Sequence, residues 1–146
     1  MGRAQRTRAL AFTLPEVLVV VLIMALLVGL AIPSLAGAAD RAAVHSAAAE
    51  LATTFAAARQ LAIQRRASVG VEIDTARGSV RVRMGEALLV SRNLHRSYAV
   101  HLEATRDSMA YDARGLGIGA ANLSVVVKRG RRADTLFVSR LGRVRR

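Results

Sequence analysis

The feature that most constrains this chain is a long apolar stretch near its N-terminus. Residues 12–39 contain one charged side chain, Glu16, and Val17–Ile32 is apolar throughout except for Gly29. As a helix, the 24 residues from Phe12 to Leu35 would be about 36 Å long, more than the ~30 Å of a bilayer's hydrocarbon core. The sequence therefore predicts a single transmembrane helix over 12–39.

Basic residues before this stretch predict its orientation. Arg3, Arg6 and Arg8 precede it, and no acidic residue does. Positive charge flanking a span favours the cytoplasmic side. We therefore expect a cytoplasmic N-terminus and an extracytoplasmic C-terminal domain.

Two ordinary interpretations of the stretch leave Glu16 unexplained. Residues 36–38, Ala-Gly-Ala, look like a signal-peptidase site with cleavage after Ala38, but the apolar run exceeds the usual ~7–15 residues. A plain membrane anchor has no use for a carboxylate at its edge, where burial is costly. A signal peptide and a plain anchor therefore remain as alternatives to an interpretation in which Glu16 has a function.

Residues 11–21, Ala-Phe-Thr-Leu-Pro-Glu-Val-Leu-Val-Val-Val, support such an interpretation. They closely resemble the prepilin motif of type IV pilins and type II secretion pseudopilins. The resemblance implies that residues 1–11 form a leader, that a prepilin peptidase cuts between Ala11 and Phe12, and that Phe12 is then N-methylated. It also implies that Glu16 neutralises the N-terminal amine of a neighbouring subunit during filament assembly, which offsets the cost of burying both charges.

The motif departs from the family pattern at two positions. Ala11 stands where the family usually has glycine, and Pro15 stands where many members have an aliphatic residue. Proline is tolerated in the first turn of a helix. Pro33 would be residue 22 of the processed chain, where pilins often carry a kinking proline.

An amphipathic pattern continues the helix over residues 40–67. Apolar residues recur there at spacings of 4, 3, 4, 3 and 4, at Val44, Ala48, Leu51, Phe55, Ala58 and Ala62. This stripe predicts a helix packed on the core of a domain, and a surface for a partner helix is the alternative. In pilins, one long helix consists of a transmembrane N-terminal half and an amphipathic C-terminal half of this kind.

From Ser68 onward the apolar period changes to two, which is typical of strands. The expected strands are 69–73, 80–84, 87–90, 99–103, 123–128 and 135–139. Gly130 marks a hairpin between the last two, and Gly115, Gly117 and Gly119 are expected to form a loop. The predicted fold class is α+β, a long N-terminal helix on an antiparallel β domain over 68–146.

No pattern predicts catalysis, a cofactor or a metal. The chain has no cysteine, which excludes disulfides and thiol chemistry. His45, His95 and His101 lack metal-ligand spacing, and Glu72 and Asp74 share one solvated strand face. We expect a substrate of a peptidase that is not itself an enzyme.

The C-terminus is strongly basic in a chain with a formal net charge of +12. Its basic residues are Lys128, Arg129, Arg131, Arg132, Arg140, Arg143, Arg145 and Arg146, against one acid, Asp134. The hairpin tip (128–132) and the tail (140–146) lie at opposite ends of the predicted strand 135–139, which indicates two patches. Arginine binds phosphates bidentately, but a solvated face, or contact with anionic lipid or protein, is also open. Phe137 alone among aromatics lies here, so base stacking is not supported.

Residues 111–115 and 135–145 resemble the GspH/FimT group of minor pilins and pseudopilins. Gly142-Arg143-Val144-Arg145 fits a GRxR motif that is associated with DNA binding in FimT-like pilins. The resemblance implies that Arg143 and Arg145 contact phosphates and that Gly142 lets the backbone approach. Arg146 and the tip residues Lys128, Arg129, Arg131 and Arg132 would add contacts.

Two functions follow from these resemblances. The first is a minor type IV pilin that binds extracellular double-stranded DNA non-specifically for uptake in natural transformation. The alternative is a GspH-like minor pseudopilin, a structural or assembly subunit of the type II secretion system. Either would be a single-pass protein of the bacterial inner membrane with a periplasmic domain, assembling with other pilins into a filament.

Overall fold

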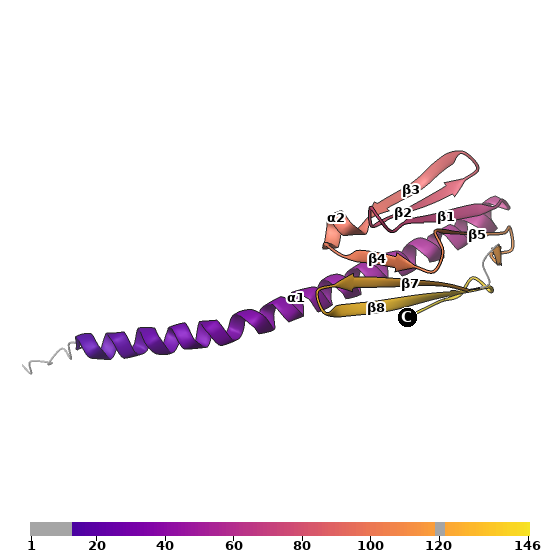
Figure 1. Ribbon diagram of the computed structural model, residues 1–146. Helices are drawn as coiled ribbons and strands as arrows, with labels where there is room; N and C mark the ends of the chain where they lie inside the picture. Colours follow the sequence, from indigo (N-terminus) through magenta and orange to yellow (C-terminus); the bar gives the residue numbers. More distant parts are fainter. Residues whose placement is uncertain (1–12, 119–121) are drawn as a thin grey trace, which may run out of the picture. The chain divides into compact units, whose positions relative to one another are not determined.

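The computed structural model describes residues 13–118 and 122–146, without the side chains of residues 30–36 (Figure 1). The chain divides into two units, Met1–Ala36 and Gly37–Arg146. Helix α1 (Leu14–Arg65) begins in the first unit and ends in the second. The predicted cleavage site, Ala11 and Phe12, lies outside the described residues.

In the first unit, two hydrogen bonds between Thr13 and Glu16 close the start of α1. The Glu16 amide donates to the Thr13 carbonyl at 3.0 Å, and the Thr13 amide donates to Glu16 Oε2 at 3.4 Å. This reciprocal pairing satisfies backbone donors that a helix start otherwise leaves free. Glu16 therefore has a local role besides the predicted role in assembly.

The large apolar side chains of the first unit are all exposed where described. Their exposed fractions run from 46% at Val20 to 74% at Leu14. Over the described residues, no helix is both long and apolar enough to cross a membrane. The predicted span over 12–39 includes residues 12 and 30–36, which lie outside the described side chains, and it stays a prediction.

In the second unit, the C-terminal half of α1 supplies one side of the core. All six residues of the predicted stripe are buried, and Ala47 joins them. They belong to the same buried cluster as the sheet residues, and Figure 1 shows this half of α1 beside the strands. The prediction that the stripe packs on a domain core is confirmed.

One sheet has five strands in the order β3-β2-β1-β5-β6. Its described strands are β1 (Val69–Asp74), β2 (Ser79–Met84), β3 (Ala87–Asn93), β5 (Ser108–Tyr111) and β6 (Gly117–Ile118). All pairs are antiparallel. Alternate residues such as Val69, Val71 and Ile73 face the core, as the period-two pattern predicts.

A second antiparallel sheet has the order β4-β7-β8-β9. Its strands are β4 (His101–Ala104), β7 (Asn122–Arg129), β8 (Arg132–Ser139) and β9 (Val144–Arg145). Leu123, Val125, Val127, Leu136 and Val138 turn inward and are buried. The predicted hairpin at Gly130 is confirmed, with Arg129 opposite Arg132. The α+β class is likewise confirmed.

Four elements were not predicted, namely β5, β6, β9 and the short helix α2 (Leu94–Tyr98). The strand expected over 99–103 begins only at His101, because Ala99 caps α2 in a left-handed conformation with φ 53°. Gly117 was expected in a loop and instead pairs with Tyr111 in β6. Gly119 lies outside the described residues.

Candidate nucleic-acid interface

The two arginines of the GRxR segment flank Val144, with Arg143 directly before β9 (Val144–Arg145) and Arg145 within it. Side chains alternate along a strand, and Val144 between them is half-buried against the core. Arg143 and Arg145 are both exposed. Neither side chain forms an ion pair or hydrogen bond with another described residue. Both guanidinium groups are thus available to an anion.

These arginines border a groove with a volume of about 540 Å³. The exposed side chains of Phe137 (53%) and Leu141 (59%) give the groove an apolar surface. The remaining lining residues are Asn122, Ser124, Val138 and Ser139. We call this surface the arginine groove.

A tight turn positions the arginine groove. The Ser139 amide donates to the Arg143 carbonyl and the Gly142 amide donates to the Ser139 carbonyl, each at 2.9 Å. Gly142 has a φ of 71°, and a Cβ there would clash with the Gly115 carbonyl oxygen and lie 2.8 Å from Arg59 Nε. Glycine is therefore required here for a structural reason, and its predicted role in approaching DNA stays a prediction.

The loop that contacts Gly142 is itself held in place by a carboxylate. Asp112 Oδ1 accepts hydrogen bonds from the Leu116 and Arg114 amides at 2.9 and 2.8 Å. Chiefly through the bond from Leu116, the pKa of Asp112 lies below its ordinary value. The loop presents the Gly115 carbonyl to Arg59, whose Nε donates to it at 2.9 Å. Helix α1, this loop and the turn before β9 are thereby linked.

Arg146, predicted as a DNA contact, turns the other way. Its Nε donates to Asp134 Oδ2 at 3.2 Å and its Nη2 donates to His45 Nδ1 at 3.0 Å. His45 lies on α1, so this arginine ties the last residue of the chain to the helix. The structure places Arg146 in an anchoring contact, away from the outer face that carries Arg143 and Arg145.

The hairpin tip is partly neutralised by its own neighbours. Lys128 Nζ lies 2.6 Å from Glu103 Oε2, and Arg129 Nε lies 2.9 Å from Asp40 Oδ1. Arg129 also donates to the Tyr98 carbonyl at 2.7 Å. Arg131 and Arg132 are exposed and have no carboxylate partner among the described residues.

The tip and the arginine groove are separate patches. Arg132 lies at the start of β8, and Phe137, opposite Arg145, lies five residues along the same strand. At about 3.4 Å per residue, that separation is about 17 Å. The prediction of two patches is confirmed for Arg143 and Arg145, whereas Arg146 reaches back to Asp134, close to Arg132 in the chain.

The family described as Type II transport protein GspH matches residues 47–142, more than half of the chain. The chain belongs to the GspH family. This confirms the resemblance to the GspH/FimT group of minor pilins and pseudopilins. Among curated proteins, no sequence is significantly similar.

Two solved structures share the fold of this GspH-family chain. The type IV minor pilin FimU of Pseudomonas aeruginosa has a TM-score of 0.62 and 17% identity, over 72% of this chain and 88% of FimU. The minor pseudopilin EpsH of the Vibrio cholerae type 2 secretion system has a TM-score of 0.57 and 10% identity, over 70% of this chain and 94% of EpsH. At such identities the likeness shows the fold alone.

The family match ends at the edge of the arginine groove. It includes Gly142 and the hairpin tip but stops before Arg143 and Arg145. Membership in the GspH family therefore does not decide between the two predicted functions, and the residues that would decide follow the matched segment directly.

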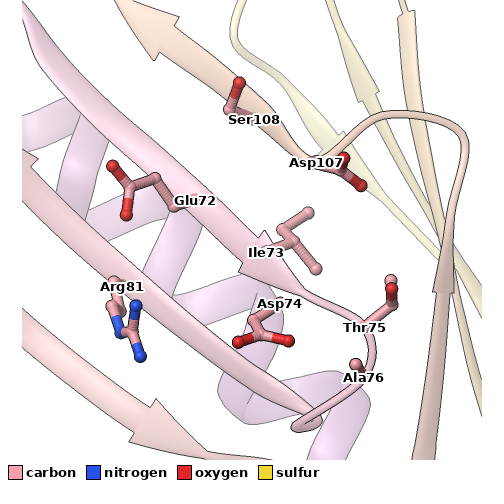
Figure 2. Close-up of a pocket in the computed structure, with 8 residues that line it drawn as sticks. All are labelled: Glu72, Ile73, Asp74, Thr75, Ala76, Arg81, Asp107 and Ser108. Carbon is pink, nitrogen blue, oxygen red and sulfur yellow. The ribbon is translucent and has the colours of Figure 1, made fainter.

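A second hollow, of about 450 Å³, is acidic in character (Figure 2). Glu72, Asp74 and Asp107 line it together with Arg81 and Ser108. Asp74 accepts from the Arg77 amide at 2.9 Å and pairs with its guanidinium, which together hold the pKa of Asp74 below its usual value. No cluster of three or more metal-binding side chains occurs among the described residues. The predicted shared face of Glu72 and Asp74 is confirmed.

The histidines have structural contacts. His45 accepts from Arg146, and His95 Nδ1 lies 3.0 Å from the Val100 carbonyl oxygen. The His95 and His101 rings lie 5.2 Å apart, centroid to centroid. These contacts match the expectation of surface or satisfied histidines.

Sequence reasoning missed Leu141 and set Phe137 aside as a stacking residue. The sequence contains a signal for Phe137, because an apolar residue between the inward-facing Leu136 and Val138 must face outward. Its proximity to Arg145 depends on the pairing of β8 with β9, which the sequence does not reveal.

Proposed function

We propose that this chain is a FimT-like minor pilin of a type IV pilus that binds extracellular double-stranded DNA for uptake in natural transformation. The observation that supports this is the arginine groove, in which Arg143 and Arg145 are exposed on one face without partners among the described residues. Such a pair suits contact with backbone phosphates and carries no sequence preference.

Binding across a salt series tests this proposal. Fluorescence anisotropy would follow a labelled duplex titrated with the full-length protein in neutral detergent micelles. We expect affinity to fall steeply with salt, and the double variant Arg143→Gln, Arg145→Gln to bind more weakly, with a log–log salt slope shallower by about 2.

A matched variant separates site-specific binding from general charge. Arg65→Gln with Arg96→Gln removes the same charge from exposed positions outside the groove. It should bind DNA almost as wild type does. If both double variants lose affinity equally, the net charge and not the groove accounts for binding.

The N-terminal motif supports a second part of the proposal. A prepilin peptidase removes residues 1–11, Phe12 becomes N-methylated, and Glu16 pairs with the amine of a neighbouring pilin in the filament. Before assembly the protein spans the bacterial inner membrane once, with its second unit in the periplasm. Intact mass measurement of protein from membranes tests this, since cleavage after Ala38 would leave a much shorter chain.

A structural role as a GspH-like minor pseudopilin of type II secretion is the alternative. The family match is as consistent with this role as with the first, because the matched residues end before the two arginines that favour DNA binding. Absence of DNA binding at low salt by the full-length protein would favour this alternative.

A further inference from the structure

The centre of the arginine groove is an uncovered aromatic ring. Pairing in the second sheet sets Phe137 opposite Ser124 on β7 and opposite Arg145 on β9. The three side chains therefore form a row across the outer face of the sheet. Phe137 is 53% exposed. An apolar ring left open beside a cation is suited to a nucleotide, whose planar base can stack on the ring while its phosphate pairs with the cation.

Polar side chains complete the groove on its other side. Asn122 pairs with Ser139 in the adjacent row, and both line the groove with Arg143. Amide and hydroxyl groups of this kind both donate and accept hydrogen bonds. The groove thus joins an aromatic surface, two phosphate-binding groups and polar groups that can contact the edge of a base.

The groove has room for a base. Its volume of about 540 Å³ lies within the ~300–1,000 Å³ typical of small-molecule sites. In an intact duplex the faces of the bases are stacked on one another, so Phe137 would contact nothing there except at an end. In a single strand every base offers a free face, and aromatic side chains use these faces for stacking.

We propose that Phe137 stacks an unpaired nucleobase while Arg143 and Arg145 hold the adjoining phosphates, so that a single-stranded segment gains a contact at the groove that an intact duplex does not. This inference rests on the proposed function, because it assigns a DNA structure to the same site. It revises the expectation from sequence that stacking is unsupported, since one ring next to two arginines replaces the interleaved aromatics that the sequence lacks.

The test compares two DNA probes on the full-length protein in neutral detergent micelles. One is an oligothymidine of about 20 nucleotides, and the other is a blunt duplex of the same length closed by G·C pairs that resist fraying. The variants are Phe137→Ala, Phe137→Leu and Phe137→Trp, with Leu88→Ala as the matched control. Leu88 is 51% exposed on β3 and lies outside the groove.

We expect Phe137→Ala and Phe137→Leu to bind oligothymidine about tenfold more weakly, and Phe137→Trp to bind it as tightly as wild type. Their affinity for the duplex and both salt slopes should stay within about twofold of wild type, because no phosphate contact is lost. Leu88→Ala should match wild type on both probes.

Three outcomes would overturn the inference. If Phe137→Ala binds both probes as wild type does, the ring stacks no base, while DNA binding by the arginines stands. If wild type binds neither probe, the proposed function fails and this inference with it. If DNA binding is unchanged but Phe137→Ala abolishes a self-association seen by sedimentation, the groove holds a second copy of the chain.

Discussion

The hairpin tip and the C-terminal tail have similar compositions and different structural roles. At the tip, Lys128 and Arg129 are neutralised by Glu103 and Asp40, and Arg129 holds the hairpin to α1 and to Tyr98. In the tail, Arg146 anchors the chain end, whereas Arg143 and Arg145 have no partner among the described residues. Arginine count therefore does not locate a binding surface. Which cations are free depends on where the fold places the few carboxylates.

Gly142→Ala, in the turn that positions Arg143 and Arg145, is the change with the largest expected effect on stability. Its φ of 71° and the nearby Gly115 carbonyl should make alanine cost about 3 kcal/mol in the free energy of unfolding. Gly85→Ala is the matched control, because Gly85 has a φ of 58° and open space around it. It should cost about 1 kcal/mol. Urea unfolding of the two variants measures both, and equal losses would contradict the tight packing around Gly142.

Single glutamine substitutions should separate anchoring arginines from free ones. Arg129→Gln removes an ion pair and a hydrogen bond from a side chain that is one-third exposed, and should lower the free energy of unfolding by about 1 kcal/mol. Arg145→Gln should leave stability within about 0.5 kcal/mol of wild type. Thermal unfolding measures both. A larger loss for Arg145→Gln would assign that residue an unseen structural contact.

Asp134→Asn should convert Arg146 from an anchoring arginine into a free one. Removing the charge that pairs with Arg146 should cost about 0.5–1 kcal/mol in stability, since both side chains are 29% exposed. It also releases one arginine and raises the net charge by one, so DNA affinity should rise up to about twofold. Anisotropy titration with a duplex measures the rise, and a loss of affinity would mean that the anchored Arg146 positions the groove.

The smallest effect is a pH dependence at Asp112, the residue that fixes the loop against Gly142. Its pKa in the folded chain lies below the ordinary ~3.9, so its contribution to stability is complete above that value and is lost as pH falls through the folded pKa. Asp112→Asn has no such titration. The stability advantage of wild type over this variant should therefore shrink between about pH 5 and pH 2, as thermal melts would show. A constant difference would contradict the role of the charge.

The spacing of apolar residues correctly predicted the long helix and the longer strands, because many residues contribute to each of these patterns. The stripe from Val44 to Ala62 is buried at every predicted position, because one apolar face repeated over several turns leaves little ambiguity. The strands that alternate over five or more residues were found within a few residues of their ends. The missed elements are short. Strand β9 has two residues, and its existence depends on pairing with β8.

The site was less predictable than the fold, for a related reason. The sequence placed Arg143 and Arg145 in a tail without a strand, and Phe137 joins them only through the register of β8 with β9. The pairing of Arg146 with Asp134 and His45 links residues 12 and 101 positions apart. No local pattern in a sequence encodes such contacts, so the sequence could not separate anchoring from free arginines.

The central claim is that the free arginines of the tail, and not the paired residues of the tip, contact DNA. NMR spectra of the arginine Nε–H groups of residues 37–146, recorded during titration with a short duplex, test it most directly. We predict that the signals of Arg143 and Arg145 shift progressively with DNA, while those of Arg129 and Arg146 stay in place. Shifts confined to the hairpin tip, with Arg143 and Arg145 unchanged, would contradict the account.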